Sequence, residues 1–116
     1  MKTHISVQAA VVTMLVAKRP VLAKLPIRWE LRSNGGVYVD LDLFADAAIV
    51  PQVAAEMARA IRGAKTNGWD IQQDDGTVTR AYQVTGQQSG VRVEFLAYQR
   101  GLRPDEVAAL EGGDAV

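Results

Sequence analysis

Apolar and polar residues alternate most clearly in two neighbouring stretches, residues 27–31 and 37–44. A period of two is typical of a strand with one buried and one exposed face. The parity of the apolar residues predicts a hairpin with a three-residue loop, 34–36, and a glycine in left-handed geometry. This register places Leu31 opposite Val39 on the apolar face.

Two other segments repeat their apolar residues at helical spacing. The first runs from a cap at Ser6 to about Lys18 and is ended by Pro20. The second begins near Val50 and ends before Gly63. Such patterns indicate amphipathic helices that bury one stripe against another element.

The rest of the chain predicts three more strands and a short helix. Residues 69–73 and 77–84 pair across a two-residue Asp75-Gly76 turn, and residues 91–97 follow a polar loop. This arrangement predicts an α+β protein of order αββαβββα, with a mostly antiparallel five-stranded sheet and two helices on one face.

One domain accounts for residues 1–111, and residues 112–116 are expected to form a frayed C-terminal tail. The alternation also predicts which apolar residues form the core. The expected core residues are Ile27, Trp29, Leu31, Val39, Leu41, Met57, Ile61, Trp69, Ile71, Val93 and Phe95.

Composition restricts the chemistry further. The 116 residues are 48% hydrophobic and 22% charged, the mixture of an ordinary globular domain. Thirteen basic and thirteen acidic residues cancel, so no global field draws the protein to a polyanion or an acidic membrane. With no cysteine and one histidine, zinc lacks its usual ligands, and we expect neither a metal site nor a cofactor.

The N-terminus loosely resembles a signal peptide, because Lys2 precedes an apolar stretch over residues 7–16. Gln8 and Thr13 interrupt that stretch, and basic residues follow where a cleavage site would have small ones. A core helix is the preferred interpretation. We therefore expect a cytoplasmic protein without a membrane anchor.

Asp40 and Asp42 share one strand face, and paired carboxylates can bind a cation or serve as acid and base. An enzyme using this pair is one alternative. Arg28 and Arg32 lie across the predicted hairpin, however, so an ordinary surface charge ladder is the preferred explanation of the pair. No nucleophile motif or nucleotide-binding loop is present, and we predict that the protein is not an enzyme.

The last strand has apolar residues on both faces, because Leu96 and Tyr98 point away from Val93 and Phe95. Phe44 similarly interrupts the polar face of its own strand. Clustered apolar residues on a surface mark an interface. The leading hypothesis is therefore a small protein-binding or regulatory module that binds another protein or a second copy of itself.

The alternative partner is a nucleic acid. Four arginines on or just beyond the last two strands could grip a phosphate backbone beside aromatic rings. These candidate contacts are Arg80, Arg92, Arg100 and Arg103.

Several elements together resemble small uncharacterised α+β proteins of actinobacteria and of their phages or integrative elements. The similarity rests on the first helix, the strand Ile27-Arg-Trp-Glu-Leu31, the alanine-rich middle helix and the strand Gly90-Val-Arg-Val93. It implies an intracellular bacterial or phage setting and transfers no active-site residue.

Overall fold

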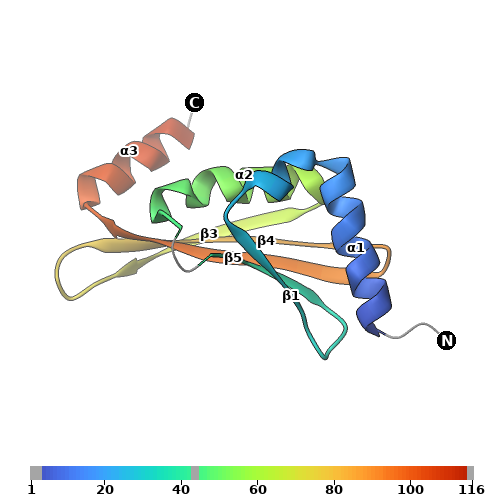
Figure 1. Ribbon diagram of the computed structural model, residues 1–116. Helices are drawn as coiled ribbons and strands as arrows, with labels where there is room; N and C mark the ends of the chain where they lie inside the picture. The colour runs from blue at the N-terminus through green and yellow to red at the C-terminus, as the bar shows by residue number, and fades with distance from the viewer. Residues whose placement is uncertain (1–3, 43–44, 115–116) are drawn as a thin grey trace.

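Five strands form one sheet in the order β1-β2-β5-β4-β3, and three α-helices lie on one side of it (Figure 1). The computed structural model describes residues 4–42 and 45–114. The strands are β1 (Ile27–Leu31), β2 (Val37–Leu41), β3 (Lys65–Gln72), β4 (Val78–Gln88) and β5 (Val91–Leu102). The helices are α1 (His4–Lys18), α2 (Val50–Ala60) and α3 (Pro104–Asp114), with short 3-10 helices η1 (Pro20–Lys24) and η2 (Ala47–Ile49). The predicted α+β class with five strands is confirmed.

The sheet is mixed, because β2 and β5 are parallel while all other neighbouring strands are antiparallel. The chain leaves β2, crosses the helix side through α2, and enters the sheet again at its far edge as β3. The β3-β4-β5 meander then brings β5 back beside β2 in the same direction. The sheet is therefore less antiparallel than predicted. Three helices lie on its one side where two were expected, because the short C-terminal helix is longer than predicted and joins α1 and α2 there.

The first hairpin keeps the predicted faces but not the predicted register. Arg32 pairs with Gly36, and Leu31 lies opposite Val37. The loop has three residues, as expected, but starts one residue earlier, with Gly35 at a φ of 90°. Gln8 of α1 explains the pairing, because its Nε2 donates to the carbonyl oxygens of both Arg32 and Gly36 at 2.6 Å.

The second hairpin differs by one residue, which reverses the faces of β3. Gln73 donates to the carbonyl of Thr77, so the turn has three residues and ends on Gly76, whose φ is 86°. The Asp75 carboxylate stabilises this turn by accepting from the Thr77 amide at 2.9 Å. A shift of one residue moves every side chain of a strand to the other face. The predicted two-residue turn is therefore wrong.

The third hairpin is tighter than predicted. The expected polar loop at residues 85–90 is wrong, because β4 and β5 pair as far as Gln88 and Val91. Only Ser89 and Gly90 form the turn, with φ values of 53° and 78°. Positive φ at both central residues is the geometry that matches the twist of a two-residue hairpin.

The core lies between the sheet and helices α1 and α2. Of the predicted core residues, Val39, Met57, Ile61, Val93 and Phe95 are buried. Three others are partly buried against the core, namely Ile27, Trp29 and Leu41. The prediction is wrong for three that are exposed, namely Leu31, Trp69 and Ile71.

Helix α3 packs separately, through a small cluster of Val107 with Val78 and Leu102. It extends to Asp114, into the range expected to be a frayed tail.

Candidate functional site

The side of the sheet away from the helices, here called the open face, carries a line of apolar side chains. Directly paired residues share a face, and Trp69 pairs with Ala81, which in turn pairs with Tyr98. Strands are about 4.8 Å apart, so the two aromatic residues lie roughly 10 Å apart across the sheet. We name Trp69, Ile71, Ala81, Leu96 and Tyr98 the open-face patch.

The large side chains of this patch are accessible to solvent. Trp69, Ile71 and Tyr98 are 40%, 39% and 38% exposed, whereas Ala81 between the two rings is fully buried. Single exposed apolar residues are common on protein surfaces, but a contiguous group marks a contact surface.

Two shallow hollows flank Tyr98 and Arg100. One has a volume of about 330 Å³ and is also lined by Ile71, Gln73 and Thr79. The other, about 310 Å³, extends towards Asp40 and Asp42. Tyr98 and Arg100 therefore form a ridge between two depressions. Side chains of a partner can fit into these depressions.

The other half of the open face, over β1 and β2, is polar and its charges are paired. Arg28 lies 3.6 Å from Asp40, and Arg92 of β5 lies 3.3 Å from Glu94. Exposed pairs of this kind contribute at most about 1 kcal/mol each to stability, but they cancel charge locally. This half of the face is thus a neutral ladder.

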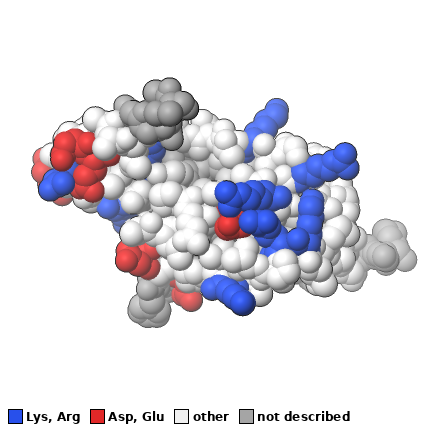
Figure 2. All heavy atoms as spheres, turned by 90° about the horizontal axis from the view of Figure 1, so that it is seen from above, with Lys and Arg blue, Asp and Glu red and all other residues white. Residues whose placement is uncertain are grey.

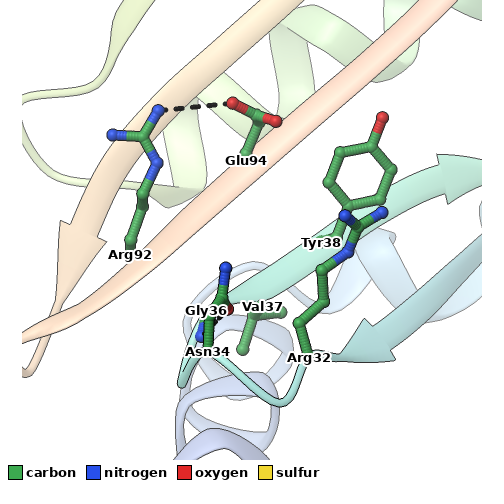
Figure 3. A pocket seen from close by; sticks show the side chains of 7 residues that line it. All are labelled: Arg32, Asn34, Gly36, Val37, Tyr38, Arg92 and Glu94. Carbon is green, nitrogen blue, oxygen red and sulfur yellow. Dashed lines mark hydrogen bonds and ion pairs between the residues drawn. The ribbon is translucent and has the colours of Figure 1, made fainter.

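A small hollow of about 80 Å³ lies between β2 and β5 in this polar half (Figure 3). The Arg32 guanidinium lies over the Tyr38 ring, 4.1 Å from its centre, in a cation–π contact. Partial burial raises the pKa of the Tyr38 phenol above its ordinary value, and the nearby carboxylates of Asp40 and Glu94 add to this effect.

The four arginines proposed for nucleic-acid contact are not brought together. Arg80 lies on the helix side, where its guanidinium is 5.9 Å from the centre of the Tyr82 ring. Arg92 and Arg100 are on the open face, at different positions along β5. Arg103 lies beyond β5 and pairs with Asp105 and Glu106.

The two aspartates proposed as an acid–base pair line the second hollow together. Asp40 is committed to structure, because its Oδ1 accepts from the Leu41 amide at 2.8 Å and its Oδ2 pairs with Arg28. Over residues 4–42 and 45–114, no group of three or more acidic, histidine or cysteine side chains is arranged to hold a metal ion.

Of the proposed interface residues, Leu96 and Tyr98 lie on the open face, and Phe44 falls outside the described residues. Sequence reasoning missed Trp69 and Ile71, which it assigned to the core. The available signal was Asp75-Gly76-Thr77, since an aspartate that caps its own turn suits a three-residue loop ending on glycine.

The free edge of β3 borders the open-face patch. β3 is the last strand of the sheet, and all eight of its residues are exposed. Gln73 bonds to β4, and bonding alternates along an antiparallel strand, so Thr66, Gly68 and Asp70 direct their backbone groups outwards. The Gly68 amide accordingly donates to the side chain of Asn67.

Within the part of the chain that the structure describes, no helix is both long and apolar enough to span a bilayer. Comparisons of the chain with protein family models, with curated proteins and with solved structures find no match. The resemblance to actinobacterial and phage proteins therefore stays a prediction.

Proposed function

We propose that the protein is a protein-binding module that acts as a homodimer, joined through the edge of β3 and the adjoining open-face patch. The observation that carries this proposal is the pair of exposed rings, Trp69 and Tyr98, on either side of Ala81 and next to an unpaired strand edge. Tryptophan, tyrosine and arginine dominate the energetics of protein interfaces. Trp69, Tyr98 and the neighbouring Arg100 supply all three types.

The edge of β3 favours pairing with another strand. Exposed edge strands usually carry prolines, bulges or charges that block such pairing. β3 contains two charged residues, Lys65 and Asp70, but no proline among its eight residues. Its register with β4 is continuous, so it has no bulge. Its outward carbonyl groups, and its outward amides apart from that of Gly68, which donates to Asn67, are therefore available to a partner strand.

Charge complementarity favours a second copy as that partner. Lys65 is the first residue of β3, whereas Asp74 and Asp75 follow its end. Antiparallel pairing about a two-fold axis places the basic start of each strand beside the acidic end of the other copy. An interface of this kind is self-complementary, as closed dimers require.

The same axis, perpendicular to the sheet, keeps both open faces on one side. Trp69 of each copy then lies near the join of a continuous ten-stranded sheet. The two open-face patches merge into one larger apolar surface, which neither monomer has alone.

Sedimentation velocity tests the proposal at protein concentrations from about 1 to about 100 μM. We expect a monomer–dimer equilibrium that Thr66→Pro shifts to monomer, because proline removes an outward donor without removing a bond to β4. Leu31→Pro on β1, the opposite edge strand, is the matched control, because the Leu31 amide also points away from the sheet. It should leave the dimer intact.

Charge exchange keeps the test independent of any folding defect. Lys65→Glu and Asp74→Lys should each weaken self-association at low salt, and an equimolar mixture of the two should associate again. A monomer at every concentration contradicts the proposal, as does a dimer that is insensitive to both sets of changes.

A further inference from the structure

The helix side of the molecule carries a group of basic side chains where α1, η1 and α2 meet. Figure 2 shows basic side chains gathered on this side of the molecule, close to acidic atoms. We name this group of five basic residues the helix-side basic surface. Its members are Lys18, Arg19, Lys24, Arg59 and Arg62.

Glu56 is the acidic residue that pairs with two of these arginines. Its carboxylate accepts from Arg19 Nε at 2.6 Å and from Arg59 Nη1 at 2.8 Å. The Glu56 side chain is only 11% exposed, while those of Arg19 and Arg59 are 38% and 59% exposed. One buried carboxylate thus orients two guanidinium groups whose remaining surface faces solvent.

Helix dipoles account for only part of this charge. Lys18 and Arg59 lie in the last turns of α1 and α2, where a cation offsets roughly half a negative charge. Lys24 at the end of η1 and Arg62 beyond α2 are exposed and extend the surface further. Basic charge therefore exceeds what the helix ends need, in a chain whose formal net charge is zero.

A shallow hollow of about 270 Å³ lies within this surface, lined by Lys18, Arg19, Pro20, Val21 and Glu56. Oriented guanidiniums make bidentate bonds to phosphate oxygens, and a preordered pair loses less entropy on binding. The geometry points to the phosphate backbone of a nucleic acid as the ligand, bound without regard to sequence.

A nucleic acid fits better than an anionic membrane. Peripheral membrane binding needs large apolar side chains beside the cations, to insert below the headgroups. The exposed large apolar residues described on α1 are Ile5 and Met14. Met14 lies a full turn before Lys18 and is engaged, since its sulfur accepts from Gln88 and Ser89 of the β4–β5 hairpin.

Fluorescence anisotropy with a short duplex DNA of mixed sequence tests the inference. The variant Lys24→Gln/Arg62→Gln removes two exposed cations that take no part in the Glu56 ion pairs. We expect it to bind at least about tenfold more weakly at ~50 mM salt, and the slope of log affinity against log salt to fall by about 1.8.

The matched control is Arg28→Gln/Arg92→Gln in the polar half of the open face, which changes net charge by the same amount. It should leave affinity within about twofold, because a local surface and not total charge binds the phosphates. Equal losses in both variants overturn the inference, as does the absence of duplex binding at ~50 mM salt. Binding to phosphatidylserine vesicles without binding to DNA also overturns it.

Discussion

Arg19 and Glu56 form a 2.6 Å hydrogen-bonded ion pair that connects the end of α1 to the middle of α2. Arg19 holds the pKa of the Glu56 carboxyl below its ordinary value of 4.5, with help from Arg59. Stability from this carboxylate is present above pH 4.5 and is lost as the pH falls through its folded pKa.

Glu56→Gln should therefore flatten the acid side of the stability profile. Urea unfolding at a series of pH values from neutral to acid measures this for both proteins. We expect the unfolding free energies of the variant and the wild type to converge as Glu56 becomes protonated. Parallel profiles over the whole range would show that the ion pair does not contribute.

The two faces of the sheet should respond differently to truncation. Phe95 is fully buried beneath the helices, so Phe95→Ala should lower the free energy of unfolding by roughly 3–5 kcal/mol. Trp69→Ala on the open face should cost about 1 kcal/mol or less at concentrations where the chain is monomeric. Denaturant titration followed by circular dichroism compares the two, and equal costs would contradict the assignment of Trp69 to the open face.

Gly86 lies on the helix side of β4, and a Cβ atom added there would overlap the Cγ2 methyl group of Ile61. Since Ile61 is itself buried, it has little room to move. Gly86→Ala should therefore destabilise the protein by about 1–3 kcal/mol in thermal or urea unfolding. In an Ile61→Ala background the same change should cost less, and undiminished cost there would argue against this contact.

Tyr38 should remain neutral to higher pH than a free tyrosine, whose pKa is 10.0. Its folded pKa is raised, so stability falls as the pH rises from the unfolded pKa towards the folded one. Absorbance titration of the phenolate should show a step above pH 10 that Tyr38→Phe removes. The variant should also lose less stability than the wild type over that range.

The parity of apolar residues was enough to predict the inner face of the first hairpin. Trp29 and Val39 point towards the helices as predicted. A shift of the pairing by two residues leaves every side chain on the same face of its strand. That same robustness explains why the two-residue error in the first hairpin left its faces correct.

The face on which Trp69 lies depends on the length of the β3–β4 turn. Changing the β3–β4 turn from two residues to three moves the Trp69 side chain to the other face of the sheet. The turn length depends on Gly76 and on the bonds between Asp75 and Thr77. Local pattern reasoning weighs burial of a tryptophan more heavily than one side-chain bond in a turn. The parallel pairing of β2 with β5 was likewise beyond local pattern, because it joins strands separated by more than fifty residues.

This pairing of distant strands also bears on the order in which the parts of the sheet fold. In the part of the chain that the structure describes, β2 of the first hairpin and β5 of the meander pair at three positions, from Val37–Val93 to Val39–Phe95. The hairpins are local in sequence and close quickly, whereas this seam must close a long loop first. We expect pulse-labelling hydrogen exchange to find amides of β4 and β5 protected before those of β1. The narrow parallel seam makes docking of the two halves the slow event in folding.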